Sequence, residues 1–261
     1  MKIAILGAAG RMGKNLLRCA AKIEGCKIVA AVERSDHQFV KFEVFGYEGR
    51  GLYYTDHWPT DAEVVIDYTF HESVTANLAN AVANKQAVVL GTTGLTEAEK
   101  QCVADAAKQI PIVWAANTSM GVTLLLELVK RAAAVLNEDY DIEIDEMHHR
   151  LKKDAPSGTA LSLAEAAAAG RGVTLNDVVC YGREGIVGER PRGEIGIRNG
   201  RGGSIVGEHT VAFISDEETV EVTHKAASRE AFATGALRAA LWLDGRKPGI
   251  YNMRHVLGFS D

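Results

Sequence analysis

Several signatures of secreted, membrane-bound and nucleic-acid-binding proteins are missing from this 261-residue sequence. Its cysteines, Cys19, Cys26, Cys102 and Cys180, are scattered and form no C-x-x-C pair, as is typical of reduced cysteines in the cytosol. No apolar run is long enough to span a bilayer, and a strand pattern that starts at Lys2 leaves no room for a signal peptide. The net charge of −5 argues against general nucleic-acid binding. We therefore expect a cytoplasmic protein with no nucleic-acid or membrane partner.

Short apolar strands and helical segments alternate through the first half of the chain. Thr96 and Glu99 form a capping box at the start of the third predicted helix. This alternation predicts a parallel, doubly wound sheet of the Rossmann type, in which ligands bind at the carboxyl ends of the strands. The predicted strands are residues 2–6, 27–32, 63–68, 87–90 and 112–115, and the predicted helices are 12–21, 71–84 and 96–109.

The pattern changes after an amphipathic helix predicted at residues 122–136, because strand-like segments then dominate. A final helix is predicted at 229–243, before an irregular end. The sequence therefore predicts an α/β protein with a Rossmann-type domain (1–119), a smaller, sheet-rich α+β domain (120–228) and a C-terminal segment (229–261) that returns to the first domain. The strand-like segments of the second domain are residues 140–145, 177–181, 194–197, 204–214 and 219–223.

A glycine-rich loop follows the first predicted strand. Gly7-Ala-Ala-Gly10-Arg-Met-Gly13 has the spacing G-x-x-G-x-x-G, a variant of the dinucleotide fingerprint, in which glycines let the backbone approach a pyrophosphate at a helix N-terminus. The second strand leads to Glu33, twenty positions after Gly13, where a carboxylate can accept hydrogen bonds from ribose hydroxyls. A glycine loop alone can be a structural turn, but this order of elements favours a nicotinamide dinucleotide site.

Two arginines adjoin the predicted dinucleotide site. Arg34 directly follows Glu33, and Arg11 lies inside the glycine loop. A carboxylate repels the 2′-phosphate of NADPH, whereas a guanidinium binds it well. The presence of both groups favours use of NADH or NADPH without strict selection, although Arg34 can also be an ordinary exposed arginine.

Two further loops lie at the ends of predicted strands. Gly91-Thr92-Thr93 follows the strand at 87–90, and Ala115-Ala116-Asn117-Thr118 ends the strand at 112–115. Because ligands of doubly wound sheets bind at such ends, both loops are candidates to hold the ribose and nicotinamide. The alternative is that these residues only turn the chain.

A polar stretch in the middle of the chain runs from Glu143 to Thr159. It begins as a strand and ends in a predicted helix with Pro156 in its first turn and Gly170 as its stop. Because a helix N-terminus favours an anion, the stretch can bind a carboxylate and also supply a proton. Its basic residues are His148, His149, Arg150, Lys152 and Lys153.

Two other interpretations of this basic stretch have to be considered. Charged loops are usually solvated and carry no chemistry. Metal binding is disfavoured, because neighbours on a strand point to opposite faces, so that His148 and His149 do not converge on one ion. No Cys or His follows at ligand spacing either. We therefore expect no metal site.

These motifs resemble those of the 4-hydroxy-tetrahydrodipicolinate reductases, also called dihydrodipicolinate reductases, of bacterial diaminopimelate and lysine biosynthesis. The resemblance covers nearly the whole chain, and its most specific part is H-H-x-x-K-x-D-A-P-S-G-T at residues 148–159. Its further anchors are Gly7 to Gly13, Gly91-Thr-Thr-Gly94, Glu146-Met147, Arg183-Glu-Gly, Ile205-Val-Gly-Glu-His-Thr210 and Thr223-His-Lys-Ala.

The resemblance implies an NAD(P)H-dependent reductase that transfers a hydride to a cyclic, unsaturated, imine-like dicarboxylate. It implies a catalytic acid–base pair of His148 and Lys152, with the proton coming from Lys152. It also implies a homotetramer, in which the second domain binds substrate and forms the subunit contacts. The substrate-binding residues that it implies are His149, Gly158 and Thr159, and the cofactor-binding residues are Gly7, Ala8, Ala9, Gly10, Arg11, Met12, Glu33, Arg34, Gly91, Thr92, Thr93, Ala115, Ala116, Asn117 and Thr118.

This chain departs from the family pattern at Thr118, because many members have Asn-Phe where it has Asn117-Thr118. A backbone contact to nicotinamide would survive that difference, whereas the packing of the side chain would not.

Two other functions share part of these motifs. One is another NAD(P)-dependent dehydrogenase of amino-acid metabolism, such as an aspartate-semialdehyde dehydrogenase. That chemistry needs a reactive cysteine, and Cys102 and Cys180 are poorly placed to provide one. The other is a non-catalytic dinucleotide sensor, which has no use for a His/Lys cluster beside a carboxylate site.

Overall fold

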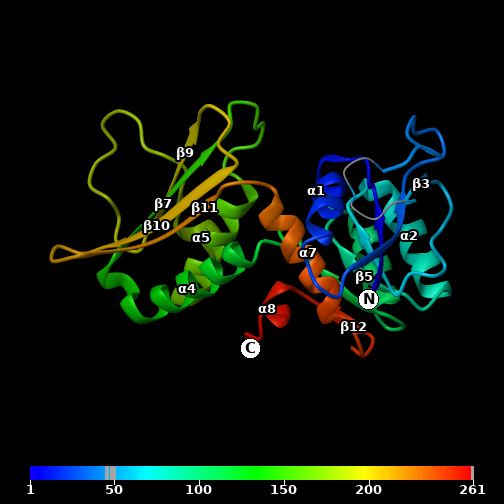
Figure 1. The fold of residues 1–261 in the computed structure, drawn as a ribbon. Helices are drawn as coiled ribbons and strands as arrows, with labels where there is room; N and C mark the ends of the chain where they lie inside the picture. The colour runs from blue at the N-terminus through cyan, green and yellow to red at the C-terminus, as the bar shows by residue number, and fades with distance from the viewer. Residues whose placement is uncertain (45–46, 48–50, 260–261) are drawn as a thin grey trace. The chain divides into compact units, whose positions relative to one another are not determined.

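The computed structural model describes residues 1–44, 47 and 51–259. The chain forms two compact units (Figure 1). Unit 1 comprises Met1–Met120 and Arg229–Asp261, and unit 2 comprises Gly121–Ser228. Within the described residues, no helix combines the length and the apolar character that a membrane span requires.

In its described residues, unit 1 is built on a sheet of seven strands, all parallel, in the order β12-β6-β5-β4-β1-β2-β3. Its central strands are short apolar runs that are buried on both faces, as expected for a sheet covered by helices on both sides. The strands are β1 (Lys2–Leu6), β2 (Lys27–Val32), β3 (Tyr54–Thr55), β4 (Val64–Asp67), β5 (Ala87–Leu90), β6 (Pro111–Trp114) and β12 (Gly249–Tyr251). The helices are α1 (Arg11–Ala20), α2 (His71–Ala83), α3 (Glu97–Ala106), α7 (Glu230–Trp242) and α8 (Met253–Val256).

Two successive residues of β5 show how helices cover both faces of this sheet. Val89 belongs to a buried cluster with Leu16 of α1 and Leu237 of α7. Its neighbour Leu90 points to the opposite face and joins a cluster with Val74 of α2 and Val103 of α3. This is a doubly wound architecture, and the predicted Rossmann-type fold class is confirmed.

The strand order of unit 1 reverses beside β1. The chain runs outward from β1 to β2 and β3, returns to β4 on the other side of β1, and continues outward to β5 and β6. The connections that follow β1 and β4 therefore leave toward opposite faces of the sheet. In doubly wound folds, the crevice at this reversal is where ligands bind.

The C-terminal part of the chain completes unit 1. β12 pairs in parallel with β6 at the sheet edge, with Ile250 opposite Ile112. α7 lies beside α1, where Arg18 Nη1 is 3.2 Å from Glu230 Oε1. The sequence predicted α7 but only an irregular segment after it, so β12 and α8 are corrections. A three-residue strand is too short to be read from periodicity.

Unit 2 contains a mixed five-stranded sheet in the order β11-β10-β7-β9-β8, with β7 antiparallel to β10 and parallel to β9. α4 and α5 lie against one face of it (Figure 1), where Val129 and Leu163 pack with Ile142 and Ile144. The predicted second, sheet-rich domain is thereby confirmed as a fold. Its strands are β7 (Asp141–His148), β8 (Val179–Cys180), β9 (Ile195–Arg201), β10 (Gly207–Ile214) and β11 (Thr219–Ala226). Its helices are α4 (Met120–Leu136), the 3-10 turn η1 (Asn137–Asp139), α5 (Gly158–Arg171) and α6 (Leu175–Val178).

The prediction that Pro156 lies in the first turn of α5 is wrong. Ser157, not the segment before Pro156, caps the helix, because its Oγ accepts a hydrogen bond from the Ala160 N–H at 3.1 Å. α5 therefore begins at Gly158, and Pro156 lies outside it.

The predicted end of α5 is also wrong. The helix continues to Arg171, and Gly172 ends it with a left-handed φ of +70°. Gly170 has a packing role instead, since an added Cβ would overlap the carbonyl oxygen of Lys130 on α4. Residues 177–181, predicted as a strand, hold the end of α6 and the two-residue β8, because short apolar runs do not distinguish helix from strand.

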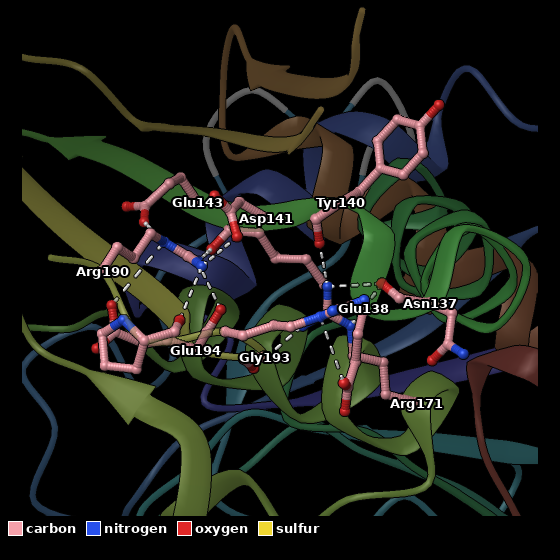
Figure 2. A network of polar contacts seen from close by, with 12 residues as sticks. Asn137, Glu138, Tyr140, Asp141, Glu143, Arg171, Arg190, Gly193 and Glu194 are labelled. Carbon is pink, nitrogen blue, oxygen red and sulfur yellow. Dashed lines mark hydrogen bonds and ion pairs between the residues drawn. The ribbon is translucent and has the colours of Figure 1, made fainter. Parts of the chain in front are cut away.

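A network of arginine contacts holds the starts of β7 and β9 together (Figure 2). Arg190 Nη2 donates to the carbonyl oxygens of Ile142 in β7 and Glu194 just before β9, at 3.1 and 2.6 Å. These bonds support the register of the two strands, in which His148 lies opposite Arg201 at the far end. The other labelled members of the network are Asn137, Glu138, Tyr140, Asp141, Glu143, Arg171 and Gly193.

Gly235 of α7 has no room for a side chain, because an added Cβ would overlap the carbonyl oxygen of Thr118 after β6. We expect Gly235→Ala to force α7 away from this strand end and to destabilise the protein by about 1–3 kcal/mol. Circular dichroism should show a melting temperature several degrees below that of the unchanged protein. Gly202→Ala is the control, since nothing lies within 4 Å of its added Cβ. Equal melting temperatures for the two variants would contradict the packing argument.

Candidate active site

A cavity of about 710 Å³ lies in unit 1 at the reversal of strand order between β1 and β4. Its volume is in the range of small-molecule and cofactor sites. Its walls come from the carboxyl ends of β1, β2 and β4 and from the first turn of α1. The predicted cofactor residues in its lining are Gly7, Ala9, Gly10, Arg11, Met12, Glu33 and Arg34.

The glycine loop brings its backbone close to this cavity. Gly7 has a left-handed φ of +73°, and an added Cβ would lie 2.8 Å from the carbonyl oxygen of Tyr68. A Cβ on Gly13 would overlap the carbonyls of Gly7 and Ala8. No side chain caps the N-terminus of α1, and its first turn has no acidic residue. The backbone N–H groups at this helix end therefore suit a pyrophosphate, and the loop fits the dinucleotide that the fold implies.

Glu33 and Arg34 directly follow β2 and line the same cavity as the glycine loop. Glu33 Oε1 accepts a hydrogen bond from the Ala9 N–H at 2.7 Å, which ties the end of β2 to the glycine loop. Among the described residues, the other oxygen of Glu33 accepts no hydrogen bond, so it can receive one from a ribose hydroxyl. Arg34 is exposed, with its Nε 3.5 Å from Asp36 Oδ1. This exposed ion pair is weak enough for a phosphate to replace.

The loops after β5 and β6 lie outside the lining of this cavity. Thr92 is buried, and its Oγ1 donates to Asp67 Oδ1 at 3.0 Å. Gly91 lies against the ring of Tyr68, where an added Cβ would overlap the ring carbons. The structure thus brings this loop onto the end of β4, and its contact with a cofactor stays a prediction.

Thr118 is buried, and its hydroxyl is engaged within unit 1. Its Oγ1 donates to the carbonyl oxygen of Phe232 at 2.7 Å and lies 2.8 Å from Tyr68 Oη. Because the Thr118 proton is used on Phe232, Tyr68 is the donor to Thr118. Burial raises the pKa of Tyr68 to about 12, which keeps that hydroxyl protonated. The threonine that departs from the family pattern therefore links β4, β6 and α7.

Sequence reasoning missed the cavity residues that follow β4. Tyr68, Thr69 and Phe70 line the cavity, together with Ser73 and Asn77 of α2. They follow the carboxyl end of a parallel strand, so the rule that we applied to the loops after β5 and β6 also points to them.

In unit 2 the basic stretch begins on a strand and continues into a loop. His148 is the last residue of β7, which extends beyond the strand predicted at residues 140–145. The side chain of His148 is buried. Lys152 lies in the following loop, with its Nζ 2.8 and 2.7 Å from the two carboxylate oxygens of Asp154. Burial is the main cause that lowers the pKa of His148, and the positive charge of Lys152 adds to the effect. The two residues are thus close enough to influence each other electrostatically.

A buried carboxylate, that of Glu146, lies at the centre of this region. Its Oε2 is hydrogen-bonded to His148 Nδ1, and its Oε1 accepts from the Ser157 N–H at 3.1 Å. Arg201 donates to both oxygens, at 3.1 and 3.0 Å. Burial opposes the ionisation of Glu146, but the hydrogen bonds outweigh it, and the pKa of this carboxyl lies below its ordinary value.

His209 of β10 joins the cluster from the neighbouring strand. Its Nε2 is 3.1 Å from Ser157 Oγ, and its ring centroid is 5.1 Å from that of His148 in an edge-on arrangement. Burial lowers the pKa of His209 to about 4, so the ring is neutral at pH 7. The Nδ1 atoms of His209, His149 and His224 are buried and have no hydrogen-bond partner among the residues that the structure describes. Such orphaned atoms are uncommon and often mark functional sites.

Glu146, His148 and His209 are close enough together to raise the question of a metal site. Arg201 already donates to both oxygens of the Glu146 carboxylate. A divalent cation would have to displace this permanently charged guanidinium. We therefore interpret the cluster as a hydrogen-bonded ion-pair network.

The start of α5 adds an anion site to the same cluster. Gly158 is exposed, and the first turn of α5 holds no acidic residue. The N–H groups of this turn and the helix dipole favour a carboxylate. Through Ser157, Glu146 joins this helix start to His148, so Gly158 and Thr159 belong to one assembly with the predicted acid–base residue.

Four members of the unit 2 cluster were not predicted as site residues: Glu146, Ser157, Arg201 and His209. Glu146, Ser157 and His209 lie within the motifs that carry the family resemblance, which was the available signal. Arg201 lies 55 positions from Glu146 in a glycine-rich segment, and no local pattern marks it.

The sequence matches family models over both units. The model described as "Dihydrodipicolinate reductase, N-terminus" matches residues 1–118, and that for the C-terminus matches residues 121–257. The chain is 45% identical over 263 residues to a 4-hydroxy-tetrahydrodipicolinate reductase from Anaeromyxobacter dehalogenans, with 98% of this chain and 97% of the relative covered. It is 46% identical over 265 residues to the enzyme of the same name from Thiobacillus denitrificans, with 100% and 99% covered.

Solved structures support the fold. A dipicolinate-bound dihydrodipicolinate reductase from Paenisporosarcina sp. TG-14 is similar with a TM-score of 0.79 at 23% identity, over 98% of both chains. A probable dehydrogenase from Thermotoga maritima reaches a TM-score of 0.61 at 9% identity, over 98% of this chain and 92% of the other. Family and fold together imply a nicotinamide dinucleotide cofactor and a small-molecule substrate. The resemblance found in the sequence is confirmed, and the chain belongs to the family of dihydrodipicolinate reductases, the 4-hydroxy-tetrahydrodipicolinate reductases.

Proposed function

We propose that unit 1 binds NADH or NADPH, and that unit 2 binds the substrate and supplies a proton for its reduction. The substrate of this reductase is a cyclic, unsaturated, imine-like dicarboxylate, and the product is tetrahydrodipicolinate in diaminopimelate and lysine biosynthesis. One observation supports the assignment of proton transfer and substrate binding to unit 2. In unit 2, a buried carboxylate joins a histidine beside a lysine-bearing loop to a helix start that favours anions.

The cofactor supplies the hydride when it is bound. The loop from Gly7 to Gly13 holds the pyrophosphate through backbone N–H groups, as its glycines and the uncapped start of α1 support. Glu33 accepts hydrogen bonds from the ribose, and Arg34 binds the 2′-phosphate when NADPH is used. We assign the remaining ribose and the nicotinamide to Gly91–Thr93 and Ala115–Thr118, at the ends of β5 and β6.

Reduction leaves an electron pair on the substrate that must be protonated, and we assign this proton to the ammonium of Lys152. His148 holds or relays charge beside it. His149, whose buried Nδ1 has no hydrogen-bond partner in the described part of the chain, binds substrate together with Gly158 and Thr159. The Paenisporosarcina protein was solved with dipicolinate, a cyclic dicarboxylate, and this supports a carboxylate at the start of α5.

Loss of either member of the acid–base pair should slow the chemical step. General acid catalysis contributes about 10²–10⁴-fold, so His148→Ala and Lys152→Ala should each lower kcat by that order. The double variant should lose less than the product of the two, because the residues act as a unit. His149→Ala should raise KM more than it lowers kcat. The rates are followed by absorbance of the reduced cofactor.

The matched control for these variants is Lys153→Ala, an exposed lysine beside Lys152. It should keep kcat near that of the unchanged enzyme, and dinucleotide affinity by fluorescence titration should be unaffected in every variant. If His148→Ala and Lys152→Ala behave like Lys153→Ala, the basic stretch is only a solvated loop and the assignment is wrong.

Both dinucleotides should be used, with a preference below about a hundredfold, because Glu33 and Arg34 favour opposite cofactors. Arg34→Ala should weaken NADPH more than NADH, since a charge-assisted bidentate contact contributes about 1.5–3 kcal/mol. Arg18→Ala is the control, another exposed arginine of unit 1 with a carboxylate partner. Equal losses for the two cofactors in Arg34→Ala would show that this residue does not bind the 2′-phosphate.

We expect a homotetramer assembled through the sheet of unit 2. α4 and α5 lie on one face of this sheet, and exposed apolar side chains such as Met147 and Val220 occur on β7 and β11. Light scattering after gel filtration should give about four times the 28.1 kDa of one chain at micromolar concentration. A mass near that of one chain would rule this assembly out.

A further inference from the structure

The side chain of Glu146 is fully buried in unit 2, with no exposed surface. Glu146 and His148 are two residues apart on β7, so their side chains point to the same face of the strand. A buried carboxylate without partners is strongly disfavoured. The partners that Glu146 has therefore indicate what it does.

An ionised carboxylate only accepts hydrogen bonds. Because Glu146 Oε2 is bonded to His148 Nδ1, that nitrogen has to carry the hydrogen. The neutral imidazole then has its lone pair on Nε2. Among the described residues, His148 Nε2 takes no hydrogen bond, and an added Cβ on Gly207 would lie 2.9 Å from it. A side chain at position 207 would therefore press against this nitrogen, and glycine avoids that contact.

Arg201 balances the charge of Glu146 and extends the network. Its two terminal nitrogens lie 3.1 and 3.0 Å from the two carboxylate oxygens, and Nη2 also donates to the carbonyl oxygen of Asp154 at 2.7 Å. Asp154 is the residue whose carboxylate holds Lys152. One ion pair therefore connects the histidine, the lysine-bearing loop and, through Ser157, the helix start.

We propose that Glu146, held by Arg201, is the positioning residue of the reaction: it fixes His148 in the tautomer with hydrogen on Nδ1 and aligns its ring with the start of α5. This proposal rests on the proposed function of His148. Glu146 itself does not touch the reacting atoms.

The charges around His148 define the expected pH response. Glu146 on β7 favours the imidazolium, whereas Lys152 in the loop and Arg201 on β9 oppose it; His209 on β10 is neutral near pH 7. Burial lowers the pKa of His148 most, and Glu146 works against that effect. Without the carboxylate, the pKa of His148 falls further, so the corresponding midpoint in the pH profile of kcat must move to lower pH.

Glu146→Gln is the test, because it keeps the shape and removes the charge. The Ser157 backbone N–H can only donate, so it should retain the oxygen of the new amide. The amide NH₂ then faces His148 Nδ1 and forces this nitrogen to accept. We expect the tautomer of His148 to switch to hydrogen on Nε2, measured by ¹⁵N NMR of histidine-labelled protein, with the His148 signals identified by their loss in His148→Ala.

The kinetic consequence should accompany the switch. We expect kcat of Glu146→Gln to fall by at least about tenfold, and by no more than the about 10²–10⁴-fold that acid–base catalysis contributes. The midpoint of its pH profile should also fall. The matched control is Glu143→Gln, a carboxylate on the same strand that is also paired with arginine, in its case Arg183 and Arg190. It should change neither the tautomer nor the midpoint.

A fold defect in Glu146→Gln can be separated from the proposed effect. The double variant Glu146→Gln/Arg201→Gln leaves no unpaired charge at these two positions. The Ser157 N–H still binds the amide oxygen at position 146, so we expect the same change of the His148 tautomer. If either folded variant keeps the Nδ1–H tautomer and the original midpoint while kcat drops, Glu146 is only structural and the proposal is overturned. If His148→Ala retains its kcat, the proposed catalytic role fails instead, while the NMR result still decides whether Glu146 sets the tautomer.

Discussion

The arrangement of the reactive part of unit 2 depends on how one buried negative charge is compensated. A carboxylate removed from water is tolerated only when hydrogen bonds and an opposite charge replace its hydration. For Glu146 these come from three separate segments: Arg201 on β9, the Ser157 N–H before α5, and His148 on its own strand. Their positions are therefore coupled, because displacement of any one leaves a buried charge unsatisfied.

The two units differ in what forms the proposed binding sites, which is mainly backbone in unit 1 and titratable side chains in unit 2. In unit 1 the cavity is formed largely by strand ends and by a tightly packed glycine loop, so it suits a large anion that requires little ionisable chemistry. In unit 2 the site is built from titratable side chains on adjacent strands. A Rossmann-type fold can host many functions, and we assign the proton chemistry of this protein to its second unit.

The sequence predicts well those features that neighbouring residues determine. Alternating strands and helices predicted the fold of unit 1, and the run of strand-like segments after them predicted the sheet of unit 2. The capping box of Thr96 and Glu99 is present as expected. The glycine loop and Glu33, which line the cavity of unit 1, could be predicted because a tight turn and a strand end carry local signals. Arg201 could not, because its partner lies far along the chain and only the strand register brings them together. The same limit explains β12, whose pairing with β6 depends on a distant strand.

Because α7 and β12 belong to unit 1, unit 2 is an insertion within the sequence of unit 1. During synthesis, residues 121–228 leave the ribosome before the segment that completes the first core. Unit 2 can thus acquire its structure while α1 and β6 still expose the apolar surfaces that α7 and β12 later cover. Truncation within the last thirty or so residues should therefore damage nucleotide binding first, although those residues are the farthest along the chain from the glycine loop.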